Sequence, residues 1–154
     1  SEGIVVRFDS KGHVEGKSND ALFCPPFFTN CIKIPRSIIV GSSVHPITDN
    51  PKVRGLKYSI EVVVADTHAF FGHGYGKKDG DWQENKQRIS EQVEYWLYEF
   101  NNTHSRELAA FYNPRSIPQQ EALQKLLRKF FIEETNLRID TGIEFVRLNS
   151  FSVD

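Results

Sequence analysis

The hydrophobic pattern of the chain changes near residue 80, and this change decides the fold class. Before it, apolar residues form short β-branched and aromatic clusters separated by glycine and proline, which is typical of strands. After it, apolar residues recur every three or four positions, which is the spacing of an amphipathic helix. A β-rich half, residues 1–80, is therefore followed by helix, strand, helix and strand in residues 81–154. We expect an α+β single domain with a mixed, mostly antiparallel sheet and two amphipathic helices packed on it.

Five strands are predicted in the first half. They cover residues 4–8, 13–15, 31–34, 38–40 and 56–65. The last has the strongest signal, because it begins with alternating apolar residues and ends in a continuous apolar run, as a central strand covered on both faces does. Residues 16–30 and 44–51 are predicted to be connections, because glycine, proline and asparagine are frequent there.

Two amphipathic helices are predicted in the second half, over residues 84–100 and 117–132. In each of them, five apolar side chains fall at helical spacing and form one stripe. The stripes consist of Ile89, Val93, Trp96, Leu97 and Phe100, and of Leu123, Leu126, Leu127, Phe130 and Phe131. Asp81 with Glu84 makes a start to the first helix that resembles a capping box. We expect both helices to cover a face of the sheet.

Three short apolar segments of the second half are predicted to be strands: residues 107–112, 137–139 and 143–148. The first is assigned as a strand because a βα unit would then precede the second helix. Thr141-Gly142 separates the last two strands and is predicted to be a bulge or turn.

The charges of the chain exclude several classes of partner. There are 19 basic and 20 acidic residues among 154, they also balance along the chain, and the longest basic run is the pair Lys77-Lys78. A protein that tracks the phosphate backbone normally carries a basic stripe, so we expect no binding to duplex nucleic acid. No apolar run is long enough to span a bilayer, so we expect no membrane association.

The two cysteines, Cys24 and Cys31, are seven positions apart, a spacing that matches neither a zinc ribbon nor a CxxC redox motif. We predict two half-buried free thiols in a reducing compartment. The first residues lack the basic and apolar regions of a signal peptide, so a cytoplasmic location is expected.

Residues 66–81 are the first candidate for a binding site, because they connect the strongest strand to the best-capped helix. Ligands commonly bind at such junctions, where the N-terminus of the helix offers free N–H groups. Four glycines between residues 72 and 80 allow close approach of a ligand, and Lys77 and Lys78 supply positive charge. The segment matches neither the P-loop nor the dinucleotide-binding pattern.

From this segment we predict a non-catalytic binding domain for a small anionic, nucleotide-type ligand, acting as a sensor or sequestering module. The expected ligand-binding residues are Thr67, His68, Phe71, His73, Tyr75, Lys77 and Lys78. No metal site is predicted, and no cofactor is assigned.

The alternative is a hydrolase or phosphodiesterase that uses His68 or His73 as a general base or metal ligand, because imidazole titrates near working pH. Asp66 and His45 would complete such a cluster. No known catalytic motif supports the hydrolase hypothesis. Without one, these histidines are interpreted as hydrogen-bonded or exposed side chains that have no catalytic role.

A further alternative is a protein-interaction or homo-oligomeric module without a small ligand. The chain has more aromatic rings than two helical stripes need, and Tyr95 and Tyr98 flank the stripe of the first helix. An exposed aromatic edge of this kind serves dimerisation as readily as ligand binding. The sequence leaves homo-oligomerisation open.

Between residues 59 and 130, a hydrophobic strand, a polar turn, a helix opened by Arg88-Ile89-Ser90-Glu91-Gln92, a strand at 109–114 and a leucine-rich helix follow one another. This order resembles the ligand-binding domain of STING-type cyclic-dinucleotide receptors. The resemblance covers less than half of the chain, and residues 1–50 contain no counterpart of the long N-terminal helix of those receptors. No site residue is carried over from it.

Overall fold

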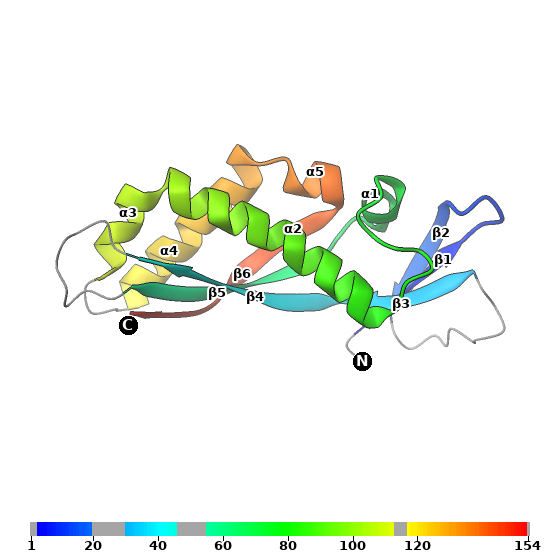
Figure 1. Cartoon of the computed structure of the whole chain (residues 1–154), viewed down its shortest axis with the longest axis horizontal. Helices are drawn as coiled ribbons and strands as arrows, with labels where there is room; N and C mark the ends of the chain where they lie inside the picture. The colour runs from blue at the N-terminus through cyan, green and yellow to red at the C-terminus, as the bar shows by residue number, and fades with distance from the viewer. Residues whose placement is uncertain (1–2, 20–29, 46–54, 113–116, 154) are drawn as a thin grey trace.

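A computed structural model describes residues 3–19, 30–45, 55–112 and 117–153 of the chain. The strands form two three-stranded sheets, and every described pairing is antiparallel. The first sheet has the order β2-β1-β3, with β1 (Gly3–Phe8), β2 (Val14–Asn19) and β3 (Cys31–Pro35). The second has the order β4-β5-β6, with β4 (Ser37–Val44), β5 (Leu56–Val64) and β6 (Ile143–Val153). The two sheets follow one another along the long axis of the molecule (Figure 1).

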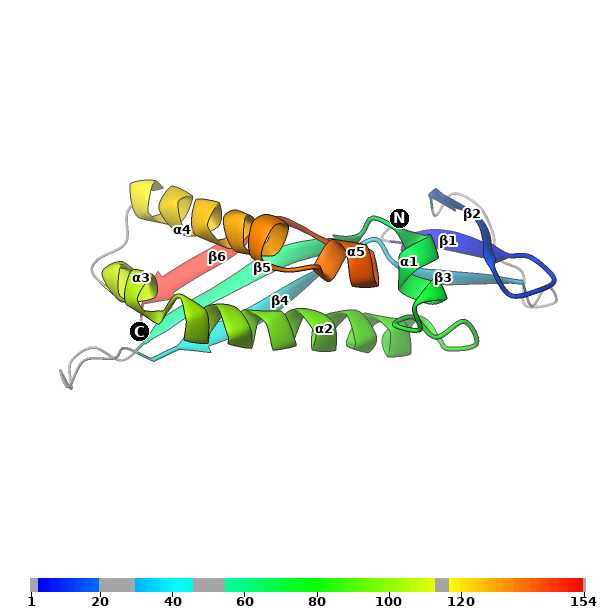
Figure 2. The same ribbon diagram turned by 90° about the horizontal axis from the view of Figure 1, so that it is seen from above.

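The helices lie on one side of the sheets. They are α1 (Thr67–Gly72), α2 (Trp82–Thr103), α3 (Ser105–Ala109), α4 (Ile117–Lys129) and α5 (Leu137–Thr141), with a 3₁₀ turn η1 (Ala110–Tyr112) after α3 and a π-helical turn η2 (Phe130–Glu134) after α4. Seen from above, α2 and α4 run side by side over the second sheet, and α1 stands near the first (Figure 2). The predicted α+β class with two amphipathic helices on a sheet is confirmed.

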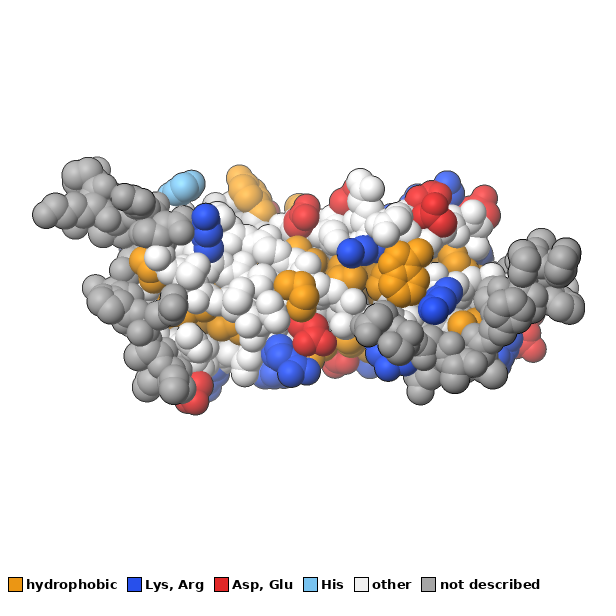
Figure 3. All heavy atoms as spheres, turned by 90° about the horizontal axis from the view of Figure 1, so that it is seen from below, with side chains coloured by type: hydrophobic (Ala, Val, Ile, Leu, Met, Phe, Trp, Pro, Cys, Tyr) orange, Lys and Arg blue, Asp and Glu red, His pale blue; other side chains and the backbone are white. Residues whose placement is uncertain are grey.

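Packing between α2, α4 and the helix-facing side of the second sheet forms most of the core. On β5 the side chains alternate, so that Ile60 and Val62 are fully buried under the helices while Lys57 is exposed on the other face. The prediction that this strand is covered on both faces is therefore wrong. The continuous apolar run at its end suggests two covered faces, but the helices of the described residues lie on one face only (Figure 1). Backbone and small polar side chains occupy much of the open face (Figure 3).

Two predicted strands are helical. Residues 107–112 belong to α3 and η1, and residues 137–139 begin α5. In α5, Leu137 and Thr141 are buried four positions apart, and Gly142 has the left-handed φ of 75° that ends many helices. The sequence predicts a bulge or turn at Thr141-Gly142 between two strands, because a short apolar run does not by itself distinguish strand from helix. The strand required at 109–114 by the receptor resemblance is also helical over its described residues, 109–112.

Other boundaries differ from the prediction as well. β2 extends to Asn19, so the predicted connection 16–30 begins with strand. Cys31 is disulfide-bonded, which corrects the free-thiol prediction at this position, while Cys24 lies outside the described residues. That prediction rested on how rarely disulfides occur in reducing compartments, whereas pairing depends on the separation of the two sulfurs in space. No helix among the described residues is long and apolar enough to cross a bilayer.

Candidate functional site

The glycine-rich segment between β5 and α2 folds into a short helix and a tight turn. Asp66 caps α1 by accepting a hydrogen bond from the Ala69 amide at 3.1 Å. After α1 the chain turns at Gly74, whose φ is 83°. Gly76 then passes so close to the core that a Cβ atom there would lie 2.5 Å from the Phe70 ring. Glycine is required at these two positions by backbone conformation and packing, which the prediction had attributed to contact with a ligand.

The buried side-chain amide of Asn85 in α2 holds this turn in place through hydrogen bonds. The side-chain oxygen of Asn85 accepts a hydrogen bond from the Lys77 amide at 2.8 Å, and its nitrogen donates to the carbonyls of Lys77 and Asp81, each at 3.1 Å. Asp81 in turn accepts from the Glu84 amide at 2.8 Å. The first turn of α2 is therefore capped by the chain's own carboxylate.

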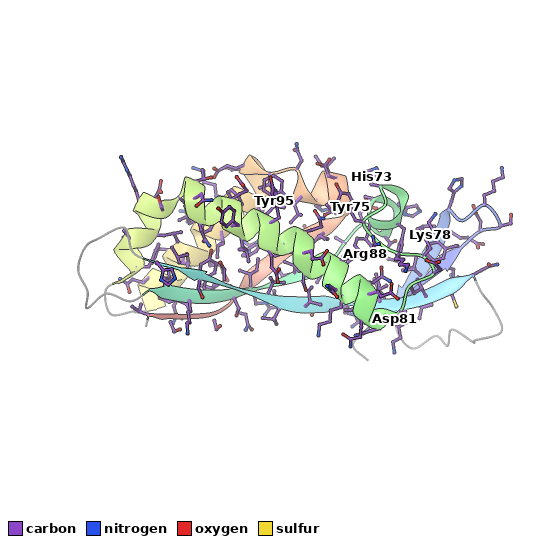
Figure 4. All side chains as sticks on the ribbon, viewed as in Figure 1. His73, Tyr75, Lys78, Asp81, Arg88 and Tyr95 are labelled. Carbon is purple, nitrogen blue, oxygen red and sulfur yellow. The ribbon has the colours of Figure 1, made fainter. Side chains whose placement is uncertain are left out.

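A groove of about 560 Å³ lies beside this turn, between it and the outer face of α2. Its lining residues are Gly74, Tyr75, Glu84, Gln87, Arg88, Glu91 and Gln92. Figure 4 shows Arg88 on α2 and Tyr75 on the facing turn. Nη1 of Arg88 donates two long hydrogen bonds across the groove wall, to the carbonyls of Tyr75 at 3.3 Å and Gly74 at 3.5 Å.

The charges around the groove are partly paired. Nζ of Lys77 lies 2.9 Å from a carboxylate oxygen of Glu84. The hydrogen bond to Glu84, and then the charge of Glu84, raise the pKa of Lys77 above its usual value. Within the described part of the chain, Arg88 forms no ion pair. Arg88 and Glu91 are therefore the two charged side chains of the groove that no described residue neutralises through an ion pair.

The seven residues predicted from the sequence do not form one site. Tyr75 lines the groove, and Lys77 borders it through its pair with Glu84. Thr67 and Phe71 are each 2% exposed, so neither can contact a ligand at the surface. Lys78 lies apart from the groove lining, with Nζ 5.9 Å above the centre of the Phe8 ring.

The histidines are also dispersed. His68 is exposed on α1, and His73 is exposed with Nδ1 2.6 Å from the Asp140 carbonyl. His45 follows β4 at the end of the sheet where β5 begins, whereas the other two follow the far end of β5. The nine residues of β5 separate these ends by about 27–30 Å. No group of three or more histidine, cysteine, aspartate or glutamate side chains in the described ranges could hold a metal ion.

Sequence reasoning missed Asn85 and Arg88. Asn85 occupies a position in the apolar stripe of α2, four residues before Ile89 and eight before Val93, and is fully buried. A polar side chain at such a position must find hydrogen-bond partners inside the protein, and this signal was available in the sequence. Arg88 could not be found in this way, because its role depends on where the turn folds back against α2.

Comparisons with known proteins provide no relative for this chain. No family model matches it, and no curated protein sequence or solved structure is significantly similar to it.

Proposed function

We propose that the chain is a non-catalytic binding domain for a small anionic ligand of the nucleotide type, held in the groove between the Gly74–Tyr75 turn and α2. The observation that carries the proposal is the guanidinium of Arg88, which has no ion-pair partner among the described residues and lies in a groove of about 560 Å³. Grooves of roughly 300–1,000 Å³ accommodate small ligands, and a guanidinium binds phosphate or carboxylate through two parallel N–H groups.

The other groove residues narrow the ligand chemistry. Since Lys77 neutralises Glu84, the charges of the groove that have no ion-pair partner among the described residues are the guanidinium of Arg88 and the carboxylate of Glu91. A ligand with one anionic group and several hydroxyl or N–H donors satisfies both charges, and a ribose hydroxyl is a usual donor to a carboxylate. The Tyr75 ring gives a planar surface for a base. A nucleoside monophosphate or cyclic mononucleotide therefore fits better than a triphosphate, whose additional charges would lie near Glu91.

The groove favours binding over catalysis. None of the described residues that line it is a histidine, cysteine, serine or threonine, and of its two carboxylates, which could act as general bases, Glu84 is paired with Lys77. His68 and His73 are not among the lining residues. The hydrolase alternative has no comparable observation in its favour.

The test is binding of a panel of AMP, cyclic AMP, GMP, ATP and inorganic phosphate, measured by thermal shift and calorimetry. A ligand at about 100 times its Kd stabilises the folded state by roughly 2.7 kcal/mol, or about 5–11 °C in Tm for a chain of this size. Arg88→Gln should abolish the shift, because it removes the charge and keeps the bulk of the side chain.

Lys78→Gln is the matched control, since it removes a cation that does not line the groove. It should bind as the unmodified protein does. The proposal is refuted if no ligand of the panel binds, or if Lys78→Gln abolishes binding while Arg88→Gln does not.

A further inference from the structure

The two edges of the second sheet are protected differently. At the β6 edge, side chains of α4 cover the outward backbone groups. Nη2 of Arg128 donates to the Val146 carbonyl at 2.9 Å, and the Leu148 amide donates to the Gln124 side-chain oxygen at 3.0 Å. These bonds occupy backbone groups that would otherwise accept another strand.

The β4 edge has no such cover over its central residues. β4 pairs with β5 along its whole length, from Ser37 to Val44. In the described structure, the backbone of residues 38–43 makes no hydrogen bond outside this pairing. The strand sequence SIIVGSSV contains no charged residue and no proline, which are the usual means of blocking an edge.

Exposed apolar side chains lie on both sides of this edge. Ile39, on the open face of the sheet, is 51% exposed. On the helix side, Asn101 of α2 donates to the Ser42 hydroxyl at 2.8 Å, so this side of α2 lies over β4. Tyr98, three residues earlier on the same side of the helix, is 64% exposed. The uncovered strand edge is thus bordered by an aliphatic and an aromatic side chain.

We infer that β4 pairs antiparallel with β4 of a second copy of this chain, which joins two β4-β5-β6 sheets into one continuous six-stranded sheet. Antiparallel pairing of identical strands follows from a two-fold axis, the commonest symmetry of homo-oligomers. Because β4 carries no charge, no register of the self-pairing brings like charges together. The pairing also covers Ile39 and Tyr98 of both copies. This inference does not depend on the ligand proposed for the groove.

The experiment is sedimentation or light scattering of the full chain from about 1 µM to about 200 µM, compared between two variants. Ile39→Lys places a charge beside the pairing edge, and Ile139→Lys makes the same change at an isoleucine of α5 that is 72% exposed. The unmodified chain and Ile139→Lys should dimerise, and Ile39→Lys should weaken the dimer by at least about tenfold. Circular dichroism should show that both variants are folded.

Hydrogen exchange identifies the surface directly. Amide protection in residues 38–43 should rise with protein concentration in the unmodified chain and not in Ile39→Lys. A chain that is monomeric throughout the concentration range overturns the inference. So does a dimer that is insensitive to Ile39→Lys, or one whose formation leaves the amides of residues 38–43 unprotected.

Discussion

Replacing Asn85 by alanine should loosen the turn that forms one wall of the groove. The change removes three hydrogen bonds, one from the Lys77 amide and two to the carbonyls of Lys77 and Asp81. A hydrogen bond contributes a net 0.5–1.5 kcal/mol, and the three together about 3 kcal/mol. In a chain of this size, this loss corresponds to a decrease in Tm of about 6–12 °C.

Chemical denaturation with the linear extrapolation measures this loss of unfolding free energy. Gln87→Ala is the matched control on the same helix, because Gln87 is exposed and, among the described residues, its side-chain amide bonds only to Glu91, at 3.1 Å. It should change the stability by less than about 0.5 kcal/mol. If Asn85→Ala loses less than about 1 kcal/mol, the amide does not hold the turn and the reasoning is refuted.

Two further predictions concern other turns. A Cβ atom at Gly142 would overlap the Asp66 carbonyl oxygen in a left-handed conformation, so Gly142→Ala should lose at least about 3 kcal/mol of stability. Gly72→Ala, where a Cβ meets open space, should be nearly neutral by the same denaturation assay. A hydrogen bond from the His13 amide lowers the pKa of Asp9, so this turn is favoured above the usual pKa of a carboxyl group. The bond should weaken as the pH falls through the lowered pKa, as amide exchange of His13 would report, and a pH-independent amide would contradict this.

Much of the fold was predictable because long, strongly periodic segments carry their own signal. The helix predicted over residues 84–100 is α2, Trp82–Thr103, and the strand predicted over 56–65 is β5, Leu56–Val64. In both, a hydrophobic face must be buried, and the period of the apolar residues identifies the element that can bury it.

The two wrong strand predictions lie in segments where the apolar pattern is short. Residues 107–112 form α3 and η1, and Leu108 and Phe111 of that segment are buried by packing that a short apolar run does not reveal. Residues 137–139 are predicted to be a strand from a three-residue apolar pattern, whereas they begin the five-residue helix α5, which ends before Gly142. In these places tertiary contacts, and the residue at which a helix can end, decide the structure.

The groove lies beside the connection that the sequence singles out, but most of the side chains that line it are not the predicted ones. Tyr75 was predicted and lines the groove, whereas the two lysines expected to bind an anion are an ion-pair partner of Glu84 and a neighbour of the Phe8 ring. The cation in the groove, Arg88, is contributed by the helix that follows. Two segments must fold against each other before this residue becomes part of a site, so the sequence pattern of neither segment indicates it.

Nuclear magnetic resonance titration of the isotope-labelled chain with a nucleoside monophosphate tests the central claim most directly. We predict saturable chemical shift changes centred on the amides of Gly74 and Tyr75 and on the guanidinium of Arg88, which line the groove. Arg88→Gln should remove these changes. Changes confined to Lys78 and the neighbouring β1 strand, or a spectrum that does not respond to any nucleotide of the panel, would contradict the account.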